Sequence, residues 1–251
     1  PTPQHSSAAS DVYKRQKLKK RDGDLSLGAF RQNGYMREAL VNFMALLGWA
    51  FDDKQQLFTL EELVEKFSLK NIGRSAGVFD TDKLTALNAD HIRAASVRQL
   101  VPRALPFFRD KGYDAADDDY LAGVIGTLHT RSKTLVEMAD GAHFYYREDV
   151  RPYDDKAAKK FLKPETARVL ALLAEQLGEL DNLAEKTQEG AFKRVMDETG
   201  LGFGKIAQPV RVALTGTTVS PGIFELIEAL GKTRVLARLR AAVEFIESTG
   251  K

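Results

Sequence analysis

The sequence contains no cysteine among its 251 residues. This absence excludes disulfide bonds, thiolate metal sites and cysteine nucleophiles. The four histidines, at positions 5, 91, 129 and 143, are scattered, and no pair has the spacing of metal ligands. No apolar run approaches the roughly 20 residues that a membrane-spanning helix needs. These absences favour a reducing, aqueous compartment, so we expect a cytoplasmic protein with no metal site and no membrane contact.

A large excess of charge is also lacking, since the formal net charge is only +2. Any affinity for nucleic acid must therefore come from the placement of charges rather than from their sum. Hydrophobic residues make up 43% of the chain, which is enough to build a core larger than one compact domain usually holds. We expect two domains or three small ones.

The first 16 residues, PTPQHSSAASDVYKRQ, are small and polar, include two prolines and show no periodicity. This composition predicts disorder, and the segment lacks the apolar core of a secretory signal. We interpret residues 1–16 as a non-native leader; the alternative is a natural flexible tail.

Helical periodicity dominates the last 150 residues or so, whereas residues 17–96 have a mixed pattern. In FTLEELVEKFSL (58–69), Thr59 and Glu62 have the spacing of a capping box, and Phe58 and Leu63 that of a hydrophobic staple. The helical pattern that starts at residue 80 is expected to break near Asn88.

Prolines and glycines predict further helix boundaries. The segment 97–113 carries Pro102 and Pro106, so we expect it to be kinked or divided. Pro164 suits the first turn of a helix. In the last 32 residues, Ser220 is expected to cap a helix that Gly231 closes. Phe43 and Trp49, together with the aromatic run at 144–146, are expected to lie in the core.

A basic run, KLKKR at residues 17–21, stands before a glycine step. Taken alone it fits a solvated charge patch as well as it fits a phosphate-binding loop. Its context favours the loop. The segment continues to GY at 34–35 and ALLGW at 45–49, and is followed in order by FTLEELVEKFSL, VFDTDKLTALNADHIR and GKIAQPVRVALTGTTVSPGIFELIEALGK.

These blocks resemble, in the same order, bacterial glutamyl-tRNA synthetases, which are class I aminoacyl-tRNA synthetases. The resemblance runs from about residue 17 to 245 and begins at the signature loop. It implies a mainly α fold, with a mixed α/β stem-contact region followed by an all-helical anticodon-binding region of two subdomains. The implied domains are the loop and stem-contact domain at 17–96 and the anticodon-binding subdomains at 97–165 and 166–251.

By this resemblance the chain is the carboxy-terminal part of a glutamate–tRNA ligase, without the nucleotide-binding fold that holds most of the ATP site. Such an enzyme activates glutamate with ATP and Mg²⁺ and transfers it to tRNA-Glu. The resemblance makes Lys17 and Lys20 catalytic, with Lys20 and Arg21 at the ATP phosphates. A mobile loop with two lysines suits charge neutralisation on a leaving pyrophosphate. Lys19 departs from the family, which has serine there.

The resemblance also implies the tRNA contacts. Arg131 matches the position that reads the third anticodon base, and Arg211, Lys193 and Ser220 match further anticodon contacts. Arg74 matches the stem-contact surface. The structural alternatives are an exposed helix arginine for Arg131, a pair with a carboxylate for Arg211, and an N-cap for Ser220. Asn88 fits either a helix-ending cap or an RNA contact.

Two other functions remain open: a free-standing, non-catalytic helical tRNA-binding module, and a helical protein-interaction scaffold. The scaffold would show no salt-dependent tRNA binding. Glutaminyl-type synthetases share the catalytic ancestry but have β-barrel anticodon regions, and the helical stripes from 117 to 247 argue against them. We expect a monomer that binds tRNA weakly and does not aminoacylate by itself.

Overall fold

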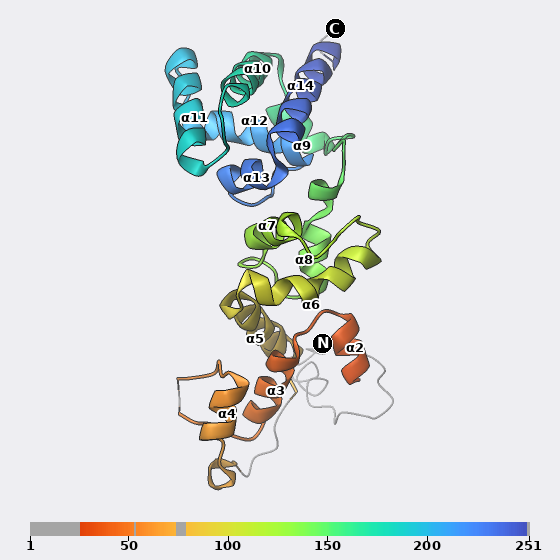
Figure 1. Ribbon diagram of the computed structural model, residues 1–251, viewed down its shortest axis with the longest axis vertical. Helices are drawn as coiled ribbons and strands as arrows, with labels where there is room; N and C mark the ends of the chain where they lie inside the picture. Colours follow the sequence, from red (N-terminus) through yellow and green to blue (C-terminus); the bar gives the residue numbers. More distant parts are fainter. Residues whose placement is uncertain (1–25, 53, 74–78, 250–251) are drawn as a thin grey trace, which may run out of the picture. The chain divides into compact units, whose positions relative to one another are not determined.

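The computed structural model describes residues 26–52, 54–73 and 79–249, in which nearly all regular structure is helical (Figure 1). The predicted mainly α fold is confirmed. The chain divides into two compact units: Pro1–Phe107 with His129–Met138, and Phe108–Leu128 with Ala139–Lys251. The chain passes between the units at three points: inside α6 (Val97–Asp110), at the end of α7 (Asp119–Leu128) and inside α8 (Leu135–Gly141). Within the described part of the chain, no helix is long and apolar enough to cross a membrane.

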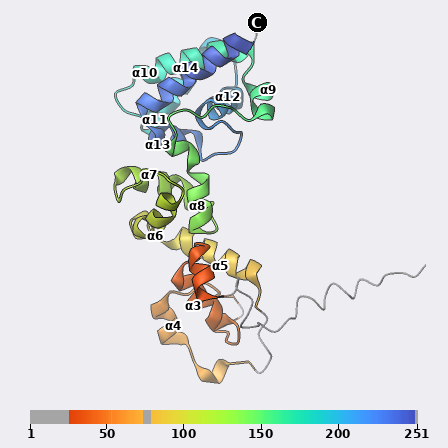
Figure 2. The same ribbon diagram turned by 90° about the vertical axis from the view of Figure 1, so that its right-hand side faces the viewer.

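The first unit is built around two helices that pack side by side, α3 and α5 (Figure 2). Its further elements, apart from those shared with the second unit, are α2, α4 and the short 3-10 helix η3. The bounds are α2 (Leu27–Gln32), α3 (Arg37–Leu46), α4 (Leu60–Lys66), η3 (Leu69–Asn71) and α5 (Thr81–Ala94). Phe30, Phe43, Leu84 and Leu87 form the buried cluster between them, so the core position predicted for Phe43 is confirmed.

A smaller cluster under α4 contains Trp49, Phe58 and Leu63. The capping box is confirmed: the Thr59 amide donates to Glu62 Oε2 at 2.8 Å, and the Glu62 amide donates to Thr59 Oγ1 at 3.1 Å. Among the described residues of 17–96, β structure is limited to one bridge between Trp49 and Ile72, so this region is more helical than the mixture we expected.

Asn88 corrects a prediction, because α5 runs through it without a break. Its side chain is fully buried; Oδ1 accepts from the Met36 amide at 2.8 Å, and Nδ2 donates to the Lys133 carbonyl at 2.6 Å. Both expected roles, a helix-ending cap and an RNA contact, are therefore wrong. A buried amide with both atoms hydrogen-bonded instead ties three segments of the first unit together.

Gly34 lies at a close backbone approach in the same unit. Its φ is +77°, its carbonyl accepts from the Leu135 amide at 3.0 Å, and an added Cβ would lie 2.5 Å from the Val136 nitrogen. Only glycine fits this position without moving the backbone.

The second unit consists of helices, among which α10 and α14 pack side by side (Figures 1 and 2). Their bounds are α7 (Asp119–Leu128), η4 (His143–Tyr146), α9 (Asp155–Phe161), α10 (Pro164–Gly178), α11 (Glu185–Thr199), α12 (Phe203–Thr215), α13 (Ile223–Leu230) and α14 (Lys232–Thr249). Pro164 begins α10 and Gly231 closes α13 with φ +79°, as predicted.

The two prolines of α6, Pro102 and Pro106, do not divide it, and the alternative of a kink stays a prediction. The cap predicted at Ser220 is wrong, because α13 begins at Ile223 with Gly222 at its N-cap. The Ser220 hydroxyl binds the Arg211 guanidinium instead, so a tertiary contact outweighs the local signal there.

Arg238 of α14 is 3% exposed, and its guanidinium donates to three backbone carbonyls. The acceptors are Leu214 at 2.5 Å, Phe144 at 2.7 Å, and Arg147. Arg234, one turn earlier, donates to the Tyr120 hydroxyl at 2.5 Å and the Tyr145 carbonyl at 3.1 Å. The aromatic run therefore lies in the 3-10 helix η4, whose backbone carbonyls accept hydrogen bonds from two arginines of α14. Phe144 and Tyr145 are buried, as expected.

His91 of α5 is buried, and its Nε2 lies 3.0 Å from Asn42 Oδ1. That oxygen also accepts from the Phe58 amide at 2.9 Å, so Nε2 must carry a hydrogen and donate. Burial holds the pKa of His91 below its ordinary value, although Glu38 and Asp90 partly offset this effect. The native state therefore binds fewer protons at this site than the unfolded chain.

We predict that the first unit loses stability as the pH falls below about 6.5, the pKa of an unfolded histidine, by at most about 1.4 kcal/mol per pH unit. His91→Gln keeps a donor for Asn42 and does not titrate, so its unfolding free energy should vary less over pH 5 to 7. Fluorescence of the single tryptophan, Trp49, reports unfolding of this unit. Equal pH dependence in both proteins would contradict the prediction.

Candidate nucleic-acid interface

The predicted site residues fall in three places. Lys17, Lys20, Arg21 and Arg74 lie outside the described residues. Arg131 belongs to the first unit, and Lys193, Arg211 and Ser220 belong to the second. Each residue is therefore considered within its own unit.

Arg131 lies on the connection between α7 and α8 rather than on a helix, which corrects the structural alternative considered for it. Arg131 is exposed, and the next residue, Ser132, is buried. The turn thus presents the arginine at the surface beside a buried serine.

Arg211 and Ser220 are brought together. From α12, Arg211 Nη1 donates to the Ser220 carbonyl at 3.2 Å, to the Ser220 hydroxyl, and to the Pro221 carbonyl at 2.6 Å. The hydroxyl in turn donates to the Pro221 carbonyl at 2.9 Å. Arg211 thus joins α12 to the backbone and the hydroxyl of this loop.

The loop between α12 and α13 is built from its own polar groups. Gly216 turns the chain with φ +80°, and the Thr217 amide donates to Thr215 Oγ1 at 3.3 Å. Val219, at the outer part of this loop, is 79% exposed. Arg211 therefore holds an ordered loop whose apolar tip faces solvent.

Lys193 is exposed on α11 beside an aromatic group. Phe192, Phe203 and Phe224 have ring centroids 5.3 to 5.6 Å apart, and with Lys193 they line a shallow hollow of about 300 Å³. Phe203 is 39% exposed. A cation beside one exposed aromatic ring, that of Phe203, is an arrangement that single-stranded nucleic acid can use.

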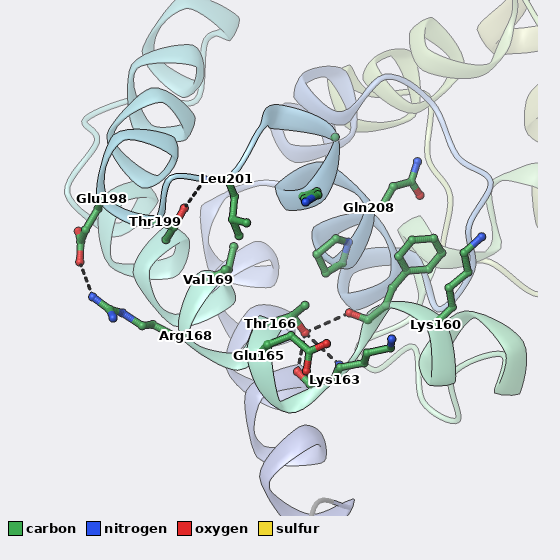
Figure 3. A pocket seen from close by; sticks show the side chains of 14 residues that line it. Lys160, Lys163, Glu165, Thr166, Arg168, Val169, Glu198, Thr199, Leu201 and Gln208 are labelled. Atoms are coloured by element: carbon green, nitrogen blue, oxygen red, sulfur yellow. Dashed lines mark hydrogen bonds and ion pairs between the residues drawn. The ribbon is translucent and has the colours of Figure 1, made fainter.

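A larger cavity of about 660 Å³ lies where the end of α9, the start of α10, the end of α11 and the start of α12 meet (Figure 3). Its lining is Lys160, Phe161, Lys163, Glu165, Thr166, Arg168, Val169, Glu198, Thr199, Leu201, Gly204, Lys205, Gln208 and Pro209. We call it the lysine cavity. In Figure 3 an ion pair between Arg168 and Glu198, 3.3 Å long, lies at one side, and Lys160 and Lys163 lie at the other.

Sequence reasoning did not single out the three lysines of this cavity. A signal was present in KKFLK at 159–163, a basic run interleaved with an aromatic residue. Lys205, however, lies more than 40 residues away in sequence, and only the fold brings it to the same cavity.

Comparison with known proteins identifies the helical part. A family model described as an anticodon binding domain matches residues 99–243, more than half of the chain. The chain belongs to the anticodon-binding domain family. The lysine cavity, Arg211, Ser220, Lys193 and Arg131 all fall within this family match. A second model, the catalytic domain of class I tRNA synthetases (E and Q), matches residues 2–86, a range that includes most of the segment interpreted as a leader.

Curated relatives are bacterial glutamate–tRNA ligases. The chain is 54% identical to that of Desulfosudis oleivorans over 94% of the chain and 50% of the relative. It is 46% identical to that of Geobacter sulfurreducens over 92% of the chain and 49% of the relative. The predicted resemblance is confirmed, and the chain spans about half the length of the curated relatives it matches.

A solved structure shares the fold. The crystal structure of a glutamate tRNA ligase from Elizabethkingia meningosepticum in complex with its amino acid matches with a TM-score of 0.81 and 24% identity. The match covers 92% of this chain and 49% of that one. At 24% identity this comparison supports the fold of the chain and says nothing of its function.

The Arg211 contacts generate a prediction. Arg211→Met keeps an apolar stem but removes every donor, leaving the Ser220 and Pro221 carbonyls without this partner. We expect the unfolding free energy to fall by about 1–3 kcal/mol, with faster amide exchange between Thr217 and Gly222. Thermal denaturation and hydrogen exchange measure the two effects.

Arg240→Met is the matched control, because Arg240 is exposed on α14 in the same unit. It should change the unfolding free energy by no more than about 0.5 kcal/mol. Unchanged exchange in the loop of Arg211→Met would show that Arg211 does not hold it.

Proposed function

We propose that the chain is part of a glutamate–tRNA ligase and that it binds tRNA-Glu. The observation that carries the proposal is the anticodon-binding family match over residues 99–243, joined to 54% identity with a glutamate–tRNA ligase. The loop held by Arg211, with its exposed Val219, supports this role because surface loops on a rigid scaffold often carry binding residues.

In this proposal Arg131, Arg211, Lys193 and Ser220 contact the anticodon loop and Arg74 contacts the stem. Arginine suits both tasks, since its planar guanidinium stacks on bases and donates to their edges. Lys193 suits a phosphate next to bases stacked at the Phe203 ring. The exposure of Arg131 and Lys193 is compatible with direct contact.

The chemistry proposed for the whole enzyme uses ATP. The glutamate carboxylate attacks the α-phosphorus and pyrophosphate leaves, which gives glutamyl adenylate. A hydroxyl of the 3′-terminal ribose of the tRNA then attacks the acyl carbon, the acyl–phosphate bond breaks, and AMP leaves. We assign Lys20 and Lys17, with Arg21, to neutralising charge on the phosphates as pyrophosphate forms. Binding energy and positioning supply the remaining rate enhancement.

Magnesium is expected with ATP. In the part of the chain that the structure describes, no group of three or more histidine, cysteine, aspartate or glutamate side chains could hold a metal. These residues therefore do not fit a protein-bound metal site, and we derive no step through Mg²⁺.

The proposal predicts salt-dependent tRNA binding that discriminates at the third anticodon base. Arg131→Gln should reduce that discrimination by about tenfold, because it removes a guanidinium donor to the base edge. The measurement compares the dissociation constants of two tRNA-Glu transcripts that differ only at this base, over a series of salt concentrations.

Arg98→Gln serves as the control, since Arg98 is another exposed arginine of the first unit. It should leave discrimination unchanged. Equal discrimination by wild type and Arg131→Gln would remove Arg131 from the anticodon site. A complete lack of tRNA binding by the wild type would instead refute the proposed function.

A further inference from the structure

The lining of the lysine cavity contains more basic than acidic side chains. Lys160, Lys163 and Lys205 line it, and among the described residues none of the three forms an ion pair. Arg168 and Glu198 offset each other, so Glu165 is the acidic group of the described lining that is left to oppose the three lysines. The cavity therefore carries a net positive charge.

Two of these lysines stand where helix dipoles disfavour them. Lys163 is the N-cap of α10, a helix of 15 residues, and Lys205 lies in the first turn of α12, a helix of 13 residues. The amino-terminal end of a helix carries partial positive charge, so a cation there destabilises the helix. A bound anion, in contrast, would be stabilised by the helix dipole and by the lysine together. An anionic ligand in the cavity would offset this unfavourable placement of the two lysines.

The backbone at the start of α12 is open to such a ligand. The N-cap is Gly202, and no side chain caps the helix. Gly204 lines the cavity, and a Cβ added to it would meet nothing within 4 Å. A phosphate can therefore approach the first amides of α12 as well as the lysines.

The rest of the lining suits a flat apolar group with polar edges. Phe161, Val169, Leu201 and Pro209 supply apolar surface. The two threonine hydroxyls are already engaged: Thr166 donates to the Lys163 carbonyl at 2.7 Å, and Thr199 donates to the Val195 carbonyl at 2.6 Å. The half-buried Gln208 amide forms no hydrogen bond to any described residue, so it can pair with the edge of a base.

We propose that the lysine cavity binds one nucleotide of the tRNA strand, with its phosphate at Lys160, Lys163 and Lys205 and its base against Phe161. The inference rests on the proposed function and extends it to a second place. Gln208 lies three residues before Arg211 on α12, so an RNA strand that contacts Arg211 has a short path to the cavity. A volume of about 660 Å³ is enough for one nucleotide.

The test uses the full chain and a transcript of tRNA-Glu. The triple variant Lys160→Ala/Lys163→Ala/Lys205→Ala should bind about tenfold more weakly. The slope of log K against log salt should become less steep by about 0.7 for each phosphate that the variant no longer neutralises. The matched control, Lys156→Ala/Lys159→Ala/Lys186→Ala, removes equal charge from exposed lysines of the same unit that do not line the cavity. It should weaken binding less than twofold.

A second variant tests the base contact. Phe161→Leu keeps the apolar volume but removes the flat ring, and we expect at least about fivefold weaker binding with an unchanged salt slope. Wild-type affinity in this variant would overturn the base contact.

The outcomes separate the two proposals. Equal weakening by the cavity variant and its control means that only general charge matters, which overturns the nucleotide site. Wild-type affinity in the cavity variant overturns it as well, and in both cases tRNA binding by the chain still stands. If wild type binds no tRNA, the proposed function fails and this inference fails with it.

Discussion

The second unit depends on one buried cation. Arg238 brings a guanidinium into the interior and surrounds it with the carbonyls of Leu214, Phe144 and Arg147. Burial is costly for a charge, and it lowers the pKa of Arg238, with neighbouring Arg234 adding to the effect. The contact at Leu214 lies at the carboxy-terminal end of α12, where the helix dipole favours a cation. The same interaction fixes the point from which the chain turns into the loop that Arg211 holds. The position of that loop therefore depends on two arginines, the buried Arg238 and the half-buried Arg211.

Local signals in the sequence predicted local structure well. The Thr59–Glu62 capping box, Pro164 at the start of α10 and Gly231 after α13 require only neighbouring residues, and all three are found. The failures share a different cause. Asparagine is a residue type that often ends helices, but the hydrogen-bond partners of Asn88 are 52 and 45 residues away. Serine often caps helices, but the guanidinium of Arg211 binds the Ser220 hydroxyl instead. Long-range partners of this kind leave no periodic pattern in the sequence.

The candidate site shows the same division. The resemblance to synthetases supplied Arg131, Arg211, Lys193 and Ser220, and the family match covers the region that contains them. The pairing of Arg211 with Ser220 followed only from the fold. The lysine cavity was not predicted because its cations come from the ends of three different helices, α9, α10 and α12. Helix ends are irregular in sequence, so their convergence has no signature.

The order in which the chain visits its two units has a practical consequence. The division falls at three points, after Phe107, Leu128 and Met138, so neither unit is a continuous segment. A deletion that keeps only residues 139–251 loses Tyr120 and so removes one of the two hydrogen bonds that Arg234 Nη1 makes, the one to the Tyr120 hydroxyl. A single cleavage in α6 or α8 likewise leaves part of one unit attached to the other. Truncation would therefore damage the unit it is meant to isolate, whereas transplanting 108–128 together with 139–251 through a new short linker preserves the partners of α14.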